Sequence, residues 1–125
     1  MARNNRMSAT FAMDSGDGAS GFTEQYGTTT FTSGDCVKID GTVNGQQTFT
    51  VADYGMAQAD GFYLENRSPT NELTVSMTNG VSPAIVEALK IAPNGVFMFR
   101  QDPDANALIQ VALTGQGEFV LILAE

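Results

Sequence analysis

The segment LTVSMT, residues 73–78, decides the fold class of this chain. Its leucine, valine and methionine alternate without interruption with threonine and serine. Because successive side chains of a β-strand point to opposite faces, this pattern predicts a strand with one buried face. Asn79 and Gly80 follow directly and predict a turn, since both residue types tolerate positive φ. The segment therefore indicates a sheet that covers an apolar core.

Similar strand signals recur from Gly27 onward at intervals of about 8–12 residues, the spacing of a sandwich or barrel. They are TTTFT, CVKIDGTV, QQTFTVA, GFYLEN, ALIQVAL and EFVLILAE. Asn44-Gly45 separates the second from the third and predicts a hairpin, because Asn-Gly favours the type I′ turn. In ALIQVAL we expect one inward and one outward set, namely Ile109, Val111 and Leu113 against Leu108, Gln110 and Ala112.

The stretch LKIAPNGVFMFR, residues 89–100, contains a second turn signal. Pro93 presets φ for the first turn position, and Asn94 and Gly95 suit the positions that follow. We expect a hairpin that joins residues 85–92 to residues 96–100. Phe97 and Phe99 are expected to divide between the core and an interface.

The chain as a whole is predicted to be all-β, with about eight to nine short antiparallel strands. A β-sandwich or jelly roll over residues 27–125 is the simplest architecture. Residues 1–26 differ in composition, because they include the small, polar, glycine-rich run MDSGDGASGF. We interpret them as an extended N-terminal arm, with plain terminal disorder as the alternative.

Composition limits the partners. The 125 residues include 14 Asp plus Glu and only 6 Lys plus Arg, a net charge of −8. Nucleic acid and anionic membrane surfaces are therefore disfavoured as partners. The single cysteine permits no disulfide within the chain, which fits folding in a reducing cytoplasm. The N-terminal sequence does not match a signal peptide, and no apolar run is long enough to span a bilayer.

The usual tools of catalysis are missing from the sequence. There is no histidine, which removes the commonest general base and most zinc sites. Cys36 is interpreted as a small buried residue rather than a nucleophile. Asp102, Asp104 and Asn106 begin a calcium-loop pattern, but Ala107 stands where that pattern requires glycine. We expect no enzyme and no cofactor, and we leave calcium at Asp102 and Asp104 open.

Several residues are candidates for contacts between subunits. Arg3 and Arg6 form the one local basic cluster, and Phe11 and Phe22 are apolar residues able to anchor an arm. Arg100 ends a strand, either in a local or cross-strand ion pair or in a bidentate bond to a carboxylate of another subunit.

The run FVLILA, residues 119–124, is apolar at nearly every position, as in a strand covered on both faces. We expect the second cover to be another subunit or the folded-over arm. The candidate contact residues in this run are Phe119, Leu121 and Leu123.

The runs ELTVSMTNG, ALKIAPNGVFMFR and ALIQVALTGQGEFVLILAE together resemble small structural proteins of tailed bacteriophages. The resemblance covers roughly residues 61–125 and is a strand-and-turn pattern rather than a catalytic signature. It implies a virion protein that is made in the cytoplasm of a bacterial host. Such proteins are β-sandwich subunits, often homotrimers, that bind the major capsid protein as decoration or cement.

Two other functions remain open at this point. One is a different virion component, such as a head fibre, a tail or adaptor piece, or a receptor-binding tip. The other is a carbohydrate-binding β-sandwich, against which the absence of tryptophan argues.

Overall fold

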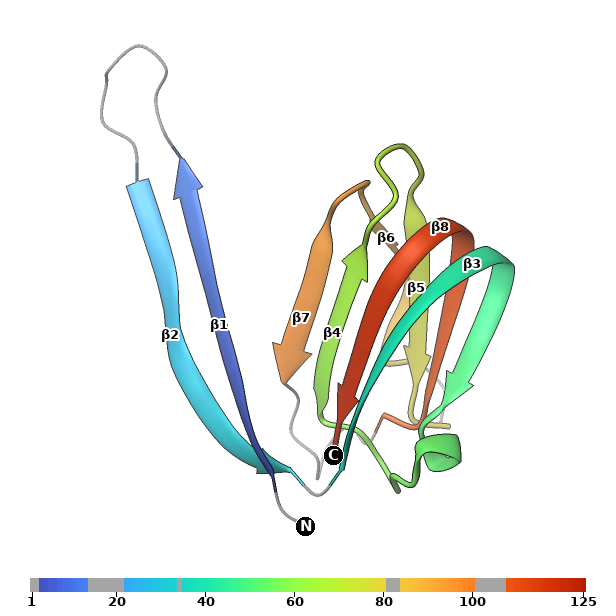
Figure 1. Ribbon diagram of the computed structural model, residues 1–125, viewed down its shortest axis with the longest axis horizontal. Coiled ribbons are helices and arrows are strands. Elements are labelled where there is room, and N and C mark those ends of the chain that lie inside the picture. Colours follow the sequence, from blue (N-terminus) through green and yellow to red (C-terminus); the bar gives the residue numbers. More distant parts are fainter. Residues whose placement is uncertain (1–2, 14–21, 34, 81–83, 101–107) are drawn as a thin grey trace. The chain divides into compact units, whose positions relative to one another are not determined.

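The computed structural model describes residues 3–13, 22–33, 35–80, 84–100 and 108–125, the first two ranges by their backbone (Figure 1). The fold is all-β and antiparallel, as predicted. The chain divides into two compact units, Ala2–Ser33 and Gly34–Glu125. In the described ranges, no helix is both long and apolar enough to cross a membrane.

The N-terminal unit is a β-hairpin. Strand β1 (Arg3–Met13) pairs antiparallel with β2 (Phe22–Ser33), and the register shifts between Met7 and Ala9. The segment expected to be an extended arm therefore has extended backbone that pairs with itself, and the pairing runs on to Ser33. We call β1 and β2 the N-terminal hairpin.

The second unit is a curled sheet of six antiparallel strands with one 3-10 turn, η1 (Val51–Tyr54). The strand order is β6-β5-β8-β4-β7, and β3 lies along the other edge of β8. The strands are β3 (Cys36–Thr50), β4 (Gly61–Asn66), β5 (Leu73–Thr78), β6 (Val86–Ile91), β7 (Val96–Arg100) and β8 (Gln110–Ala124). We call this unit the body.

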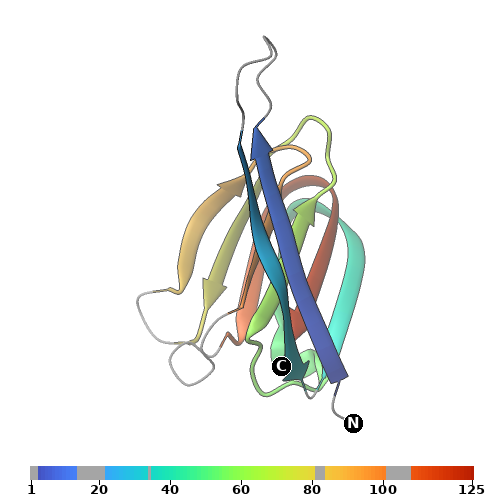
Figure 2. The same ribbon diagram turned by 90° about the vertical axis from the view of Figure 1, so that its left-hand side faces the viewer.

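The curl is produced by β3 and β8, which pair along their full length and arch together (Figures 1 and 2). The first part of β8 pairs with β5 and the last part pairs with β4. Glycines lie opposite each other at the arch, where Gly45 faces Gly115 with φ of 97° and 154°. A Cβ on Gly115 would lie 2.9 Å from the backbone oxygen of Glu72, so the bend requires glycine there.

Two sequence predictions fail at this arch. Asn44-Gly45 is not a hairpin turn but part of the continuous strand β3. ALIQVAL and EFVLILAE are not separate strands, because one strand, β8 (Gln110–Ala124), continues from the end of the first into the second. The reason is the same in each case: glycine with positive φ can bend a long paired strand as well as close a turn.

The turn at Pro93 and Asn94 forms, with the Gly95 amide donating to the Ala92 carbonyl at 2.9 Å. Asn94 has φ of 61°. The predicted hairpin is nevertheless wrong, because β6 pairs with β5 and β7 pairs with β4. The turn instead carries the chain from one end of the strand order to the other.

The core lies inside the curl. In β5, Leu73, Val75 and Met77 are buried and the residues between them are less so, which confirms the predicted alternation. Val111 and Leu113 are also buried as expected. Leu108 was expected to face outward but is buried, because β8 begins only at Gln110 and Leu108 forms a bridge with Ala59.

Three aromatic rings cluster where β4 meets β7. The rings of Phe97 and Phe99 lie 5.9 and 5.2 Å from the ring of Phe62, centroid to centroid. The expected division of Phe97 and Phe99 between core and interface is wrong. Residues two apart in a strand share a face, and both rings pack partly buried against the core.

Candidate functional site

The outer face of the sheet, opposite the core, carries a regular array of side chains where β3, β8, β4 and β7 lie side by side. Strand register places Asp40, Val120, Glu65 and Val96 in one row across these strands. The next row is Lys38, Ile122, Tyr63 and Met98. These eight residues, with Arg67 just beyond β4, are called the outer patch.

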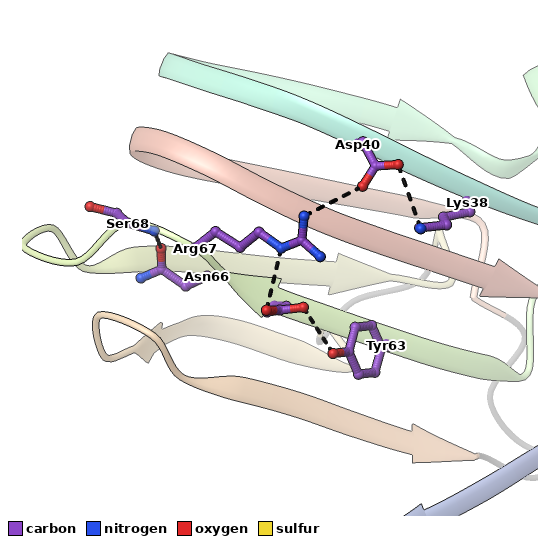
Figure 3. A network of polar contacts seen from close by, with 7 residues as sticks. Lys38, Asp40, Tyr63, Asn66, Arg67 and Ser68 are labelled. Carbon is purple, nitrogen blue, oxygen red and sulfur yellow. Dashed lines mark hydrogen bonds and ion pairs between the residues drawn. The ribbon is translucent and has the colours of Figure 1, made fainter.

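Arg67 crosses the centre of the outer patch (Figure 3). Its Nε lies 3.3 Å from Glu65 Oε1, and its Nη1 lies 4.0 Å from Asp40 Oδ1. Asp40 and Glu65 flank Val120 on its two neighbouring strands, so the arginine that contacts both carboxylates lies above Val120. Val120 is 2% exposed although it faces away from the core. We infer that the stem of Arg67 covers the outer face of β8 at Val120.

The same network continues to both sides. Lys38 Nζ lies 3.7 Å from Asp40 Oδ2, and the Tyr63 hydroxyl donates to Glu65 Oε2 at 3.0 Å. The pKa of the Tyr63 phenol is raised above 10.0, mainly by burial and then by the hydrogen bond and negative charge of Glu65. The outer patch thus alternates strand by strand, with polar and charged side chains on β3 and β4 and apolar side chains on β8 and β7.

A depression overlaps the outer patch on its β3 side and is lined by Lys38, Asp40, Gly41, Thr42, Arg67, Glu118 and Phe119. Within the residues described, no group of three or more His, Cys, Asp or Glu side chains is arranged to hold a metal ion. Cys36 lies half-buried at the start of β3 as a free thiol. Asp102 and Asp104, the open calcium candidates, lie outside the described residues.

The predicted contact residues fall in three places. Arg3 and Arg6 lie on β1 opposite Ser33 and Thr30, while Phe11 and Phe22 occupy register positions near the far end of the hairpin. Arg100 is exposed at the end of β7, opposite Gly61.

Phe119, Leu121 and Leu123 were expected to contact another subunit. The structure places all three in the core of their own chain. The residues that β8 presents on its outer face are instead Val120 and Ile122, because side chains alternate along the strand.

Asn66, at the end of β4, organises the loops at the opposite end of the body from Gly61. It is 2% exposed, and its Nδ2 donates to the carbonyls of Asn71 (2.8 Å), Ile91 (3.2 Å) and Ala92 (3.1 Å). Its Oδ1 accepts from the Ser68 amide at 3.1 Å. One buried amide therefore fixes the loop after β4 against the turn between β6 and β7.

Sequence reasoning missed both Asn66 and the Arg67 network. The sequence contains one local indication of the role of Asn66. It follows Phe62 and Leu64 at a spacing of two residues, so a polar side chain occupies a strand position that should face the core. The Arg67 network had no such indication, since Asp40, Glu65 and Val120 become neighbours only through strand register.

Comparison of the chain with protein-family models, with curated proteins and with solved structures gives no match in any of the three. The site is therefore interpreted from its own geometry.

Proposed function

We propose that this chain is a virion structural protein, a capsid decoration or cement protein that stabilises a bacteriophage head by bridging capsid subunits. The proposal starts from the sequence resemblance of residues 61–125, and the all-β body is consistent with it. An acidic chain with a net charge of −8 suits the outside of a shell, since it has little attraction for packaged DNA.

The observation that carries the proposal is the N-terminal hairpin. Its strands have 11 and 12 residues, and it forms a compact unit of its own. A two-stranded hairpin is marginally stable in water and gains stability by packing on another surface. We propose that this surface belongs to the major capsid protein and that Arg3 and Arg6 pair with acidic residues there.

The finer architecture of the body fits this role. We infer that the curl is a jelly roll in which β3 and β8 each serve two layers, one with β4 and β7 and the other with β5 and β6. We propose that three copies gather around a symmetry axis of the particle as a homotrimer. Each weak contact would then gain from the effective concentration of the others. Binding only the assembled shell would stabilise that shell by mass action.

The test is co-sedimentation with capsids assembled from the major capsid protein. Deletion of residues 1–33 should leave a folded body, judged by circular dichroism and thermal unfolding, that no longer sediments with the particles. Full-length chain with Arg3→Glu and Arg6→Glu should bind weakly, whereas Arg3→Lys with Arg6→Lys should bind nearly as well as wild type. Unchanged sedimentation of the deletion variant would exclude the hairpin as a clamp.

Copy number separates this function from the other virion roles. A cement protein should be present in numbers comparable to the major capsid protein, as measured by quantitative gel analysis of purified particles. A few copies per particle would instead indicate a head fibre, a tail or adaptor piece, or a receptor-binding tip.

A further inference from the structure

The body has three strands that pair along one edge only in the part of the chain that the structure describes: β3, β6 and β7. Such an edge presents backbone N–H and C=O groups on which another strand can pair. Proteins normally protect these edges with charged side chains, prolines or bulges. The three edges of this body differ sharply in that protection.

Two of the edges carry protection, although over different lengths. β3 carries Lys38 and Asp40 near its start, both exposed, and its uncharged remainder bends at Gly45. β6 carries Glu87 and Lys90, and its register with β5 is irregular around Ala88, which has φ of 53°. Charges and irregular pairing of this kind oppose the addition of a further strand.

The edge of β7 has no such protection between Val96 and Phe99. Its sequence, VFMFR, is apolar on both faces until Arg100. Val96 is 54% exposed, the largest exposed fraction among the large apolar side chains described. Phe97 and Phe99 are only partly buried, on the opposite face from Val96.

The backbone of β7 is oriented for pairing at this edge. The Asn66 amide donates to the Gly95 carbonyl at 2.9 Å, so Gly95 directs its carbonyl toward β4. In an antiparallel ladder, alternate residues direct their backbone groups to opposite sides. Phe97 and Phe99 therefore bond toward β4, and the backbone groups of Val96 and Met98 point to the outer edge.

We propose that the outer edge of β7 pairs antiparallel with β7 of a second copy of this chain, with Met98 opposite Met98 of that copy. This register gives the outward-directed backbone groups of Met98 hydrogen-bonding partners. It also sets Phe97 opposite Phe99 of the second copy, so the two three-ring clusters join into one apolar layer. Aromatic cross-strand pairs of this kind stabilise sheets.

The charges agree with this register. Val96 would lie opposite Arg100 of the second copy, and Val96 itself pairs with Glu65. Each arginine would therefore lie in the same row as a carboxylate of the other chain. An antiparallel pairing of identical strands is isologous and closes at two chains.

The inference goes beyond the proposed function. A threefold assembly needs a different surface, so the β7 contact would link one trimer to the next. The test below uses purified chain without any particle, so its failure would leave the cement function standing.

A single cysteine at the centre of the register tests the contact. In full-length chain with Cys36→Ser, Met98→Cys would lie opposite its own copy at about 5.5 Å between Cα atoms, within the range of a disulfide. After mild oxidation, a non-reducing denaturing gel should show a covalent pair of 26.6 kDa, twice the 13.3 kDa of one chain. Thr48→Cys on β3 and Lys90→Cys on β6 are matched controls that should stay at 13.3 kDa.

A charge variant tests the register without disturbing the fold. Val96→Lys faces Glu65 within its own chain, so it should fold, but it would place a second cation opposite Arg100 of the other copy. Added to Met98→Cys, it should abolish the covalent pair, whereas Val96→Thr should retain it. The proposal is overturned if folded Met98→Cys stays monomeric, if the controls cross-link equally, or if Val96→Lys has no effect.

Discussion

Gly41 and Phe119 face each other across β3 and β8, and the ring of Phe119 fills the space that a side chain at Gly41 would occupy. A Cβ at Gly41 would lie 2.8 Å from Phe119 Cζ and 3.0 Å from Cε1. Cβ atoms in proteins essentially never lie this close to another heavy atom. The buried ring of Phe119 therefore leaves no room for a side chain at position 41. Phe119 also meets Phe49 edge to face, with ring centroids 5.8 Å apart, which limits how far it can move.

Gly41→Ala should therefore lower the free energy of unfolding by about 1–3 kcal/mol, the usual cost of overpacking a core. The change should show in urea unfolding as a lower midpoint with an unchanged slope. Thr42→Ala, at the exposed neighbouring position, is the control. Combining Gly41→Ala with Phe119→Leu should cost less than the two single changes added together. An alanine variant as stable as wild type would mean that the ring is free to move.

Asn66→Ala should cost about 1–3 kcal/mol, because it leaves buried carbonyls and an amide without their partner. Asn66→Asp should cost more at neutral pH, since a carboxylate would face the carbonyls of Asn71, Ile91 and Ala92. It should regain part of that loss in acid, where a protonated carboxyl can donate. Asn71→Ala, an exposed neighbour, should change stability by about 0.5 kcal/mol or less. Equal effects at positions 66 and 71 would contradict the role given to Asn66.

Arg67→Ala should destabilise the body through lost cover over Val120 more than through lost ion pairs. Arg67 is 48% exposed and its carboxylate partners are partly exposed, so these pairs are worth about 0–1 kcal/mol. Arg67→Met keeps an unbranched apolar stem, and in high salt it should match wild type while Arg67→Ala remains weaker. Urea unfolding at low and high salt measures both effects. If the methionine and alanine variants behave alike, Arg67 does not act by covering Val120.

Tyr63→Phe should flatten the loss of stability in alkali. The raised pKa means that the folded chain holds the phenol proton more tightly than the unfolded chain, whose pKa lies near 10.0. That stabilisation is complete below the unfolded pKa and is lost as the pH rises through the higher folded pKa. The free energy of unfolding of wild type should therefore fall more steeply above about pH 10 than that of Tyr63→Phe. Parallel curves for the two proteins would show that Tyr63 is not the group responsible.

The strands themselves were largely predictable. GFYLEN and VFMFR coincide with β4 and β7, and the alternation of residues 73–78 appears as buried and half-buried positions in β5. These signals are local, because they depend only on the two-residue period of side chains and on residues that favour extended backbone. The apolar run at residues 119–124 predicted cover from another subunit or the folded-over arm, which stays a prediction; within the chain, Val120 is 2% exposed and Arg67 contacts the carboxylates on both sides of it.

The candidate site was not predictable to the same degree. Nothing in the sequence indicates that Asp40, Glu65 and Val120 share a row, because each lies on a different strand. Nor does it indicate that Arg67 covers Val120, or that Phe119 needs a glycine opposite. These relationships follow from strand register, in which a shift of one residue would exchange every inward side chain for an outward one.

Sequence by itself determined the extended conformation of most segments, the buried face of β5 and the glycines at which the backbone can take positive φ. Only the tertiary structure decided that Gly45 bends a strand rather than closing a hairpin, and that the turn at Pro93 connects two strands that do not pair. The physical reason is that alternation and glycine tolerance are properties of a few neighbouring residues. The choice of partner strand depends instead on burying apolar surface contributed by segments far apart in the chain.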